Sequence, residues 1–352
     1  MKVGILTFSK SINYGAALQA VALKHTVSSL GADVTVMDHP CALIDSSSKV
    51  FDFSCILSPK YVITHMINMP IAIKRAKAFK RFWSSNFEFG SDDPKNYDMV
   101  IVGSDQVWNY NLTGDDTFYF LDFKNPNVKK ASYAASFGLS EIDDKHKDRI
   151  SAFLNDFDAI SVREKTGADI ASKMTGREVP TVLDPTLLFD KERWSVLSDR
   201  NFKEKGYIFV YTVFNSDTLW DFAYKLSEKT GLPIKTISYS KFHRRNAHYS
   251  YSAGPDEWVS HIMNADYVIT NSFHGFAFSV NLEKQFYFEM PPKSSGVGSR
   301  LYDMADTFGL LDRELSVADN GVIDYSKVTP MVEEARKHSL DFLRNILNDQ
   351  RL

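Results

Sequence analysis

The sequence predicts an α/β protein of two successive domains, each built around a parallel β-sheet. The chain has 352 residues, which exceeds the roughly 250–300 residues at which a single hydrophobic core stops growing. Short apolar runs alternate with longer helical segments in both halves, as expected for strand–helix–strand units. A polar, strongly charged stretch over 189–205 separates the two halves, and we predict the domain boundary there.

The first half is predicted to form a parallel sheet from its first residues. A buried strand over 3–8 precedes a helix over 16–30, which stops at Gly31, a residue favoured just after helix ends. A second strand over 34–37 follows. This strand–helix–strand order implies parallel pairing of the two strands. Further strands are expected at 99–102, 130–136, 159–162 and 181–185, with a charged helix over 141–157.

The second half repeats the alternation. We predict strands at 207–213, 234–237 and 267–270, and helices at 219–230, 256–264 and 273–281. The amphipathic tail over 331–350 is also predicted to be helical. The expected organisation is an N-terminal domain over residues 1–190, a C-terminal domain over 205–330 and a terminal helix over 331–352.

Composition excludes several classes of function. The formal net charge is 41 − 44 = −3, so no excess of positive charge indicates a nucleic-acid partner. Cys41 and Cys55 lack CxxC spacing and a neighbouring His, which excludes a disulfide framework and a recognisable zinc site. The apolar run at the N-terminus is too short for a signal peptide, and no stretch has the roughly 18 apolar residues of a membrane span. We therefore expect a cytoplasmic protein.

Residues 53–87 differ from their surroundings in charge. The segment has no Asp or Glu and carries Lys60, Lys74, Arg75, Lys77, Lys80 and Arg81 among apolar residues. We predict a basic amphipathic helix over 70–84 that begins after Pro70. Its basic face is either solvated or in contact with an anionic surface.

Residues that directly follow the predicted strands are candidates for a site, because ligands of parallel α/β sheets bind beyond the carboxyl ends of strands. Gly15 opens the first helix, where backbone N–H groups attract anions, although a tight turn explains a glycine equally well. The surrounding spacing is neither GxGxxG nor GxxxxGK[ST]. Arg163 follows the strand over 159–162 and suits a carboxylate or phosphate ligand, or an ion pair with a nearby acid.

His274 lies in the first turn of the helix that follows the strand over 267–270. The helix dipole there favours the neutral ring and a bound phosphate favours the imidazolium, so its proton affinity can respond to substrate. A structural role in the turn is the alternative. The small-residue loop over 291–300 supplies Lys293 and Arg300 as cationic candidates, or is an ordinary surface loop.

Six short motifs, three of which contain Gly15, Arg163 and His274, occur in one order along the chain. They are 13–19, 102–109, 132–138, 161–164, 183–186 and 270–275. In this combination the chain resembles the polysaccharide pyruvyltransferase family. Each motif alone is a weak indication, but six in the same order are specific for the family. Together they span most of the chain.

The resemblance implies a fold like that of GT-B glycosyltransferases, with two Rossmann-like domains facing across a cleft. It also implies phosphoenolpyruvate as donor, with the pyruvyl group placed as a cyclic ketal on two sugar hydroxyls and phosphate released, in capsular or exopolysaccharide biosynthesis. No redox step occurs, so no cofactor is expected. The expected acceptor is a sugar or a lipid-pyrophosphate-linked oligosaccharide. The basic helix would then hold the pyrophosphate or contact the inner face of the membrane.

The motifs carry residue roles with them. His274 matches the family's catalytic His, and Arg163 matches an Arg that holds the donor. Lys293 lies about where the family has a cationic donor contact, and we add Arg300 because of its charge and proximity. The further donor-side candidates are Gly15, Ser272, Phe273 and Gly275. The acceptor-side candidates are Asn13, Asp105, Gln106, Trp108 and Asp184. No metal ligand is expected.

One position departs from the family pattern. Many members carry an acid directly after the glycine of the first motif, and this chain has Ala16 there. Either Asp105 or Asp184 replaces that acid, or the acceptor needs none. Two other functions therefore remain as alternatives: a GT-B glycosyltransferase that uses a nucleotide sugar, and a degenerate family member that binds without catalysis.

Overall fold

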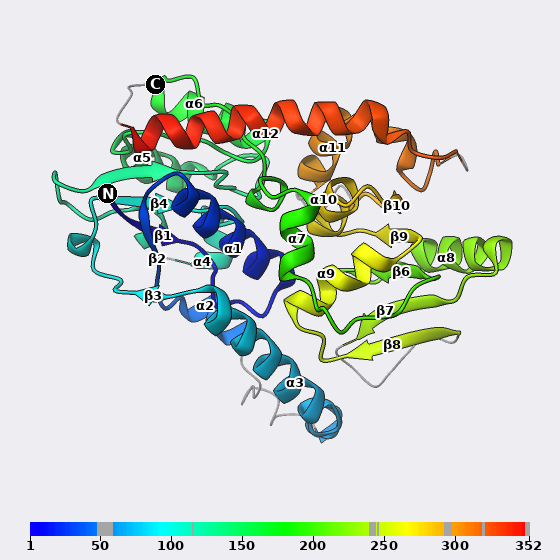
Figure 1. The fold of residues 1–352 in the computed structure, drawn as a ribbon. Coiled ribbons are helices and arrows are strands. Elements are labelled where there is room, and N and C mark those ends of the chain that lie inside the picture. The colour runs from blue at the N-terminus through cyan, green and yellow to red at the C-terminus, as the bar shows by residue number, and fades with distance from the viewer. Residues whose placement is uncertain are drawn as a thin grey trace.

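The computed structural model describes residues 1–47, 59–114, 116–238, 244, 246–291, 298–318 and 321–348. Each half of the chain forms a sheet of five strands, and all strand pairs of these two sheets are parallel in the described residues, which confirms the predicted fold class. Figure 1 shows the two sheets side by side, with the C-terminal helix running along the top of both halves.

The N-terminal sheet has the strand order β3-β2-β1-β4-β5. Its strands are β1 (Lys2–Leu6), β2 (Asp33–Met37), β3 (Phe89–Gly90), β4 (Met99–Val102) and β5 (Lys129–Ser132). The helices of this half are α1 (Tyr14–Ser29), α2 (Ala42–Ser47), α3 (Pro59–Asn86), α4 (Tyr110–Thr113), α5 (Asp144–Asn155) and α6 (Lys165–Thr175).

The C-terminal sheet has the order β10-β9-β6-β7-β8. Its strands are β6 (Ile208–Tyr211), β7 (Ile234–Ser238), β8 (Ala247–Tyr251), β9 (Tyr267–Thr270) and β10 (Gln285–Phe288). The accompanying helices are α7 (Lys191–Leu197), α8 (Asp217–Thr230), α9 (Pro255–Asn264), α10 (Phe273–Asn281), α11 (Gly298–Thr307) and α12 (Tyr325–Leu347). Counted within its own half, each sheet has the order third, second, first, fourth, fifth. The strand order therefore reverses at β1/β4 in one sheet and at β6/β9 in the other, where such folds bind ligands.

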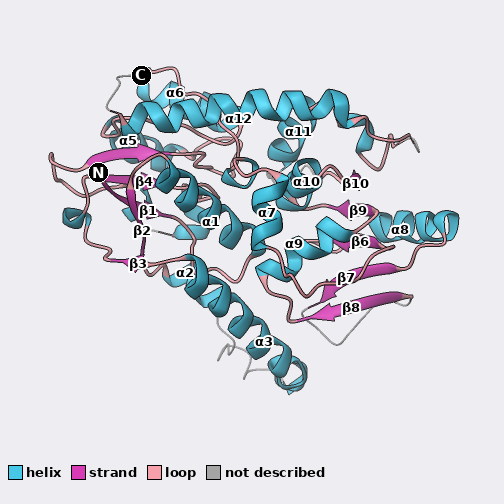
Figure 2. Ribbon diagram, in the orientation of Figure 1, coloured by secondary structure: helices cyan, strands magenta, loops and turns pink. Residues whose placement is uncertain are grey.

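Helices surround both sheets in Figure 2, and the strands are apolar on both faces for that reason. In β1, Val3 and Ile5 pack with α1 and the end of α12, while Leu6 packs with the cluster that includes α5 and α6. In β6, Ile208 packs with α8, and Phe209 packs with α9 and α10. Each sheet is thus the middle layer of a three-layer domain.

Most predicted elements are present within a few residues of their expected bounds, including 99–102, 267–270 and 273–281 without change. Two predicted strands are wrong. Residues 159–162 and 181–185 form only isolated bridges, which join Ala159, Val162 and Thr181 to the edge of the N-terminal sheet. The backbone of this edge is irregular, since Ala134 has a φ of +53°, and a regular ladder cannot continue through it.

The basic helix is longer than predicted. Pro70 lies inside α3 and not at its start. A proline inside a helix removes one hydrogen bond and costs about 3 kcal/mol. Burial of Ile71, Phe79 and Phe82 on the following turns offsets this cost. Residues 53–58 of the predicted basic segment, which include Cys55, lie outside the described residues.

Tyr14, the first residue of α1, joins the two halves of the molecule. Its ring stacks on Trp258 of α9 at 5.6 Å between centroids, and its hydroxyl donates to the Ala253 carbonyl oxygen at 2.9 Å. The centroid of the same ring lies 5.2 Å from that of Phe79 in α3. The apolar core is therefore continuous from the N-terminal domain through Tyr14 into the C-terminal domain.

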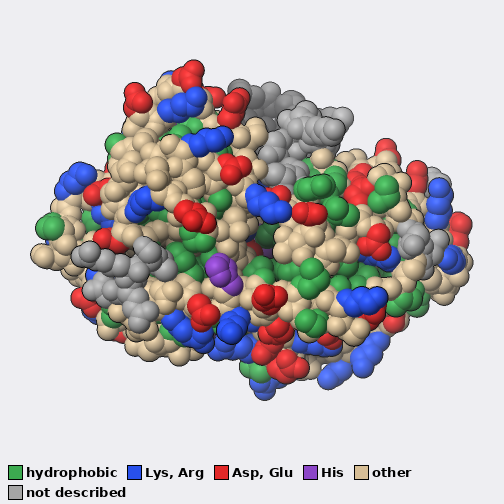
Figure 3. All heavy atoms as spheres, turned by 90° about the horizontal axis from the view of Figure 1, so that it is seen from above, with side chains coloured by type: hydrophobic (Ala, Val, Ile, Leu, Met, Phe, Trp, Pro, Cys, Tyr) green, Lys and Arg blue, Asp and Glu red, His purple; other side chains and the backbone are tan. Residues whose placement is uncertain are grey.

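The helix α12 also belongs to both halves. Val328 and Val332 pack into the core that includes the C-terminal sheet, whereas Leu343 and Ile346 pack against the N-terminal strands. Viewed from above, acidic and basic side chains are interspersed over the face that α12 crosses, and no single sign dominates (Figure 3). Among the helices in the described part of the chain, none combines the length and apolar content of a membrane span.

The junction around Tyr14 predicts a large effect of Trp258→Ala. The Trp258 side chain is fully buried and contacts Tyr14, Tyr211 and Phe278. Its truncation should lower the free energy of unfolding by about 3–5 kcal/mol, measured by urea denaturation followed by circular dichroism. The control Val322→Ala, at a side chain exposed to 78%, should stay within about 0.5 kcal/mol of the parent. Equal free energies of unfolding in the two variants would contradict a stabilising role for the packing around Tyr14 and Trp258.

Candidate functional site

The loops at the carboxyl ends of the two sheets meet between the domains. From the N-terminal sheet come Ser104, Arg163 and Asp184, and from the C-terminal sheet come Phe273 and His274. The Arg163 guanidinium lies 4.6 Å from the centroid of the Phe273 ring. Side chains that are more than 100 positions apart in the sequence therefore form one cluster, which we call the interdomain site.

The carboxylate of Asp184 is the centre of the interdomain site. Its Oδ2 accepts hydrogen bonds from Arg163 Nη1 at 2.8 Å and Ser104 Oγ at 2.8 Å. His274 Nε2 lies 3.6 Å from the same oxygen. Its Oδ1 accepts from the backbone N–H and the hydroxyl of Thr186. Both oxygens are thus occupied by the protein, and the side chain is fully buried.

The charges of the interdomain site stabilise one another. Burial alone would raise the pKa of Asp184, yet the neighbouring His274 and Arg163 hold that pKa well below its ordinary value. Burial opposes the charge of Arg163 too, but Asp184, Asp105 and Glu164 raise the pKa of the guanidinium. Arg163 and Asp184 are therefore a charged pair at neutral pH.

A second guanidinium lies beside the first. Arg300 of α11 is 5.9 Å from the Phe273 ring, so Phe273 has an arginine near it from each domain. Burial and the charge of Arg163 lower the pKa of Arg300 to about 10, which leaves it protonated at neutral pH. Among the described residues, no hydrogen-bond acceptor reaches Arg163 Nε, Arg163 Nη2 or Arg300 Nε, although all three nitrogens are buried. Buried donors without partners are costly, so this arrangement favours a bound anion.

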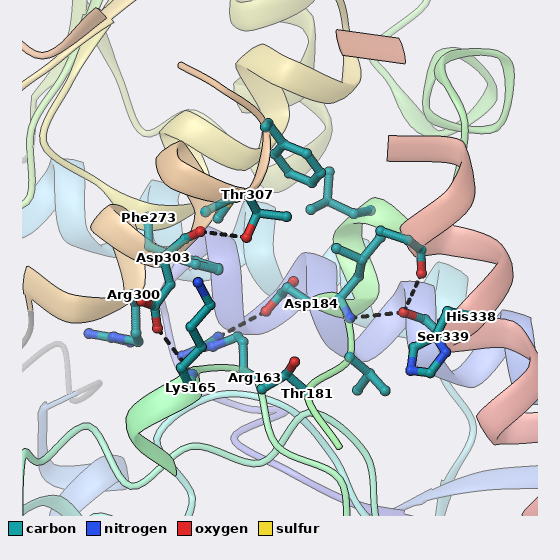
Figure 4. A pocket seen from close by; sticks show the side chains of 16 residues that line it. Arg163, Lys165, Thr181, Asp184, Phe273, Arg300, Asp303, Thr307, His338 and Ser339 are labelled. Atoms are coloured by element: carbon teal, nitrogen blue, oxygen red, sulfur yellow. Dashed lines mark hydrogen bonds and ion pairs between the residues drawn. The ribbon is translucent and has the colours of Figure 1, made fainter. Parts of the chain in front are cut away.

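A cavity of about 130 Å³ opens beside these cations. Arg163 and Asp184 line it from the N-terminal domain, Phe273 and Arg300 from the C-terminal domain, and His338 from α12. Figure 4 shows Arg163 and its bond to Asp184 at this cavity, with Lys165 bonded to Asp303 nearby. His274 does not line the cavity itself but approaches Asp184, which does.

Gly15 is explained by the approach of His274. A Cβ placed on Gly15 would lie 2.0 Å from His274 Nδ1, which is inside van der Waals contact. Only a glycine at position 15 therefore lets α1 of the N-terminal domain lie against His274 of the C-terminal domain. The helix begins normally, because Asn13 Oδ1 accepts from the Ala16 N–H.

The other donor-side candidates have mixed outcomes. Lys293 lies outside the described residues. Ser272 caps α10 by accepting from the Gly275 N–H at 3.3 Å. Gly275 allows close packing, since a Cβ there would lie 2.3 Å from Thr270 Oγ1. Both residues thus shape the turn that presents Phe273 and His274.

The acceptor-side candidates are only partly brought together. Asp105 is partly buried, has a φ of +81°, and interacts electrostatically with both arginines. Gln106 follows it and accepts from Asn109 Nδ2. The structure contradicts an acceptor contact for Trp108, whose side chain is fully buried, stacked with Phe120 and bonded through Nε1 to the Tyr119 carbonyl oxygen.

Ser104 and Glu164 complete the interdomain site, and neither was predicted from the sequence as a site residue. Ser104 bridges Asp184 and lies 3.3 Å from Arg163 Nη1. Glu164 Oε1 accepts from Ser136 Oγ, and its Oε2 lies 3.9 Å from Arg163 Nε. Ser104 belongs to the motif over 102–109 and precedes Asp105, and Glu164 belongs to the motif over 161–164 and follows Arg163. These positions, close behind predicted strands, could have identified both residues as site candidates.

Comparison with solved structures finds chains that are similar to this one over most of their length. S. aureus MnaA with UDP aligns with a TM-score of 0.50 at 12% identity, covering 99% of this chain and 97% of that chain. UDP-GlcNAc 2-epimerase from Neisseria meningitidis bound to UDP-GlcNAc gives 0.48 at 11% identity, with 99% of each chain covered. E. coli heptosyltransferase WaaC with ADP gives 0.40 at 13% identity, covering 85% of this chain and 90% of that chain. At such identities the likeness concerns the fold, which is GT-B-like.

Sequence comparison gives the family. No curated protein matches the chain. A family model described as polysaccharide pyruvyl transferase matches residues 13–288, a range that contains Gly15, Arg163, Asp184 and His274. With most of its length matched, this chain belongs to the polysaccharide pyruvyl transferase family.

Proposed function

We propose that the protein transfers the pyruvyl group of phosphoenolpyruvate to two hydroxyls of a sugar, forming a cyclic ketal and releasing phosphate. The observation that carries the proposal is the pair of arginines around Phe273. Their buried N–H groups lack acceptors among the described residues, and a small dense anion would supply them. Phosphoenolpyruvate has a carboxylate and a phosphate on three carbons, which suits two adjacent guanidinium groups.

The hydrogen bonds of Arg163 favour a role for this residue in holding the donor in place. Its Nη1 is fixed by Asp184 and Ser104, while Nε and Nη2 have no hydrogen-bond acceptor in the described parts of the chain. A guanidinium fixed at one edge is preorganised, so little side-chain entropy is lost when the anion binds. Arg300 would bind the other end of the donor.

His274 is the proposed general acid. Protonation of the methylene carbon of the donor makes the central carbon cation-like, and a sugar hydroxyl adds to that carbon. The bond from this carbon to the phosphate oxygen then breaks, and the second hydroxyl closes the ketal ring. Of the two hydroxyl protons, one balances the proton gained by the methylene carbon and the other leaves with phosphate. Asp184 would orient the imidazole and stabilise its protonated form.

Asp105 is the proposed substitute for the acid that Ala16 replaces. Asp184 has both oxygens engaged by protein groups, so it is poorly placed to accept a proton from the sugar. Asp105 is less buried, follows β4 at the point where the strand order reverses, and interacts electrostatically with the same arginines. Its strained φ is typical of residues held in place for function.

The proposed reaction is tested by mass spectrometry. The protein is incubated with phosphoenolpyruvate and a panel of galactosides, mannosides and N-acetylhexosamines, and a pyruvyl mass gain with equimolar phosphate release is expected. Binding of phosphoenolpyruvate and UDP-sugars is compared by isothermal titration calorimetry. Tight binding of a UDP-sugar without binding of phosphoenolpyruvate would replace this proposal with nucleotide-sugar chemistry.

His274→Gln should lower kcat by about 10²–10⁴-fold, the usual range for loss of a general acid. Glutamine has similar length and retains a donor near Asp184, so the fold and donor affinity should change little. Turnover is followed by phosphate release, and donor affinity by calorimetry. A kcat close to that of the parent would remove His274 from the chemistry.

Arg300→Gln should weaken phosphoenolpyruvate binding by at least about tenfold, since a charged hydrogen bond contributes about 1.5–3 kcal/mol. Arg300 is preferable to Arg163 because loss of Arg163 would leave Asp184 as an unpaired buried charge, at about 3–5 kcal/mol. Arg344→Gln, on the exposed part of α12, is the matched control. The same donor affinity in both variants would exclude Arg300 from the donor site.

Gly15→Ala should reduce activity although it adds only a methyl group. The new Cβ would occupy the space of the His274 ring, so the imidazole must move away from Asp184. The comparison variant is Ala17→Gly, two residues further along the same helix. It exchanges the same two residue types in the opposite direction and adds no atom near His274. A crystal structure of Gly15→Ala with His274 unmoved and activity retained would contradict this explanation of the glycine.

A further inference from the structure

We propose that Asp303 of α11 is a positioning residue for the donor site, and that it acts by capping α6 across the boundary between the two domains. This role rests on the proposed function, because it concerns how the guanidinium groups of Arg163 and Arg300 are held for one small anion. Asp303 bonds to the residue two positions after Arg163 and lies one turn after Arg300 on α11. A residue with these contacts can set the separation of the two cations.

The start of α6 lacks the usual side-chain cap from its own N-cap residue. That residue is Glu164, whose side chain makes no capping hydrogen bond. Its carboxylate is engaged elsewhere, because Oε1 accepts from Ser136 Oγ and Oε2 lies 3.9 Å from Arg163 Nε. The first N–H groups of a helix have no partner within the helix, so an acceptor from another element stabilises this end of α6.

Asp303 supplies that acceptor from the other domain. Its Oδ2 accepts from the Lys165 backbone N–H, the first of α6, at 3.0 Å. Figure 4 shows this bond beside Arg163 and Arg300. A carboxylate at a helix N-terminus also interacts favourably with the helix dipole. The contact is therefore an N-terminal cap whose acceptor and helix belong to different domains.

Helix α11 carries Asp303 and Arg300 on one face. The two residues are three positions apart, so their side chains project in similar directions, and both line the cavity of the interdomain site. On another face, Leu301 and Ala305 are buried in the apolar core that includes the C-terminal sheet. Apolar packing thus fixes α11 on one side and the bond to Lys165 fixes it on the other, and any shift of α11 moves Arg300 with it.

The cap couples the two arginines because the connection between them is short. Lys165 is two residues from Arg163, and Asp303 is three residues from Arg300. The two guanidinium groups lie 4.6 Å and 5.9 Å from the centroid of the same Phe273 ring. Displacements of about 1 Å at such sites strongly reduce binding or rate. Loss of the cap should therefore be felt first in the affinity for the anion.

Asp306 provides a matched comparison on the same helix. Its Oδ2 lies 3.2 Å from Lys165 Nζ, and the two side chains are exposed to 45% and 61%. Exposed ion pairs of this kind contribute little to stability. Replacing Asp306 thus removes the same charge from the same helix, next to the same lysine, and leaves the capping bond in place.

Isothermal titration calorimetry of the full chain with phosphoenolpyruvate tests this role. Asp303→Ala should weaken binding by about 3- to 30-fold, because the arrangement that binds the anion loses the contribution of a helix cap. Asp303→Asn should recover most of the affinity, since its amide oxygen can accept the same N–H. Asp306→Ala should stay within about twofold of the parent. Equal affinities in Asp303→Ala and Asp306→Ala, or equal losses in Asp303→Ala and Asp303→Asn, would overturn the capping role.

A double-mutant cycle separates positioning from a general loss of structure. If Asp303 acts through Arg300, Asp303→Ala should change the Kd by less than about twofold in the Arg300→Gln background. The same loss in both backgrounds would overturn the positioning role. In turnover, Asp303→Ala should raise KM for the donor and change kcat by less than about threefold, because the contact between His274 and Asp184 does not involve α11. A fall in kcat as large as the rise in KM would also count against positioning.

Inorganic phosphate, titrated into the same variants, separates this role from the proposed function. Binding of phosphate but not of phosphoenolpyruvate by the parent would reject the pyruvyl donor, and the same ranking of variants with phosphate would still support Asp303 as a positioning residue. Binding of phosphoenolpyruvate with unchanged affinity in Asp303→Ala would overturn the positioning role and leave the proposed function intact. Binding of neither anion by the parent would overturn both.

Discussion

The buried ion pair between Arg163 and Asp184 is the interaction on which the interdomain site depends. Both side chains are almost fully removed from solvent, and such a pair is tolerated only when its remaining hydrogen-bonding groups are satisfied. The protein satisfies Asp184 completely, with donors from Ser104 and Thr186. Two nitrogens of Arg163, Nε and Nη2, have no hydrogen-bond acceptor among the residues that the structure describes. Arg163 also lines the cavity, together with Phe273 and Arg300.

The repeated topology explains why this site lies between the domains. Each sheet reverses its strand order once, and the loops beyond that point carry the polar residues: Asp105 after β4 and His274 after β9. The two domains place these edges opposite each other, with Tyr14 and Trp258 packed between them. Gly15 then allows the imidazole to reach the carboxylate of the other domain. The fold therefore brings the charged residues of the two domains together, and small residues such as Gly15 allow their close approach.

The sequence was sufficient for the fold class because hydrophobic periodicity reports regular elements directly. It also indicated His274, which follows β9, and Arg163, which follows the segment over 159–162 that was predicted as a strand. It did not indicate that Asp184 is a centre of contacts, because that residue follows an irregular backbone whose pairing depends on distant segments. Trp108 was misassigned for a related reason: a motif does not distinguish a ligand contact from a core residue. Pro70 was taken as a helix start because local propensity contains no information about tertiary packing.

The course of α12 has a consequence for biosynthesis. Phe342, Leu343 and Ile346 complete the core that includes Val3 and Ile5, so the core around β1 stays incomplete until α12 has been synthesised. The nascent N-terminal half therefore keeps an apolar surface uncovered throughout translation of the C-terminal half. Vectorial folding, one domain after the other, cannot finish the first domain in this molecule. Chaperone engagement during synthesis is the natural protection for that surface until α12 arrives.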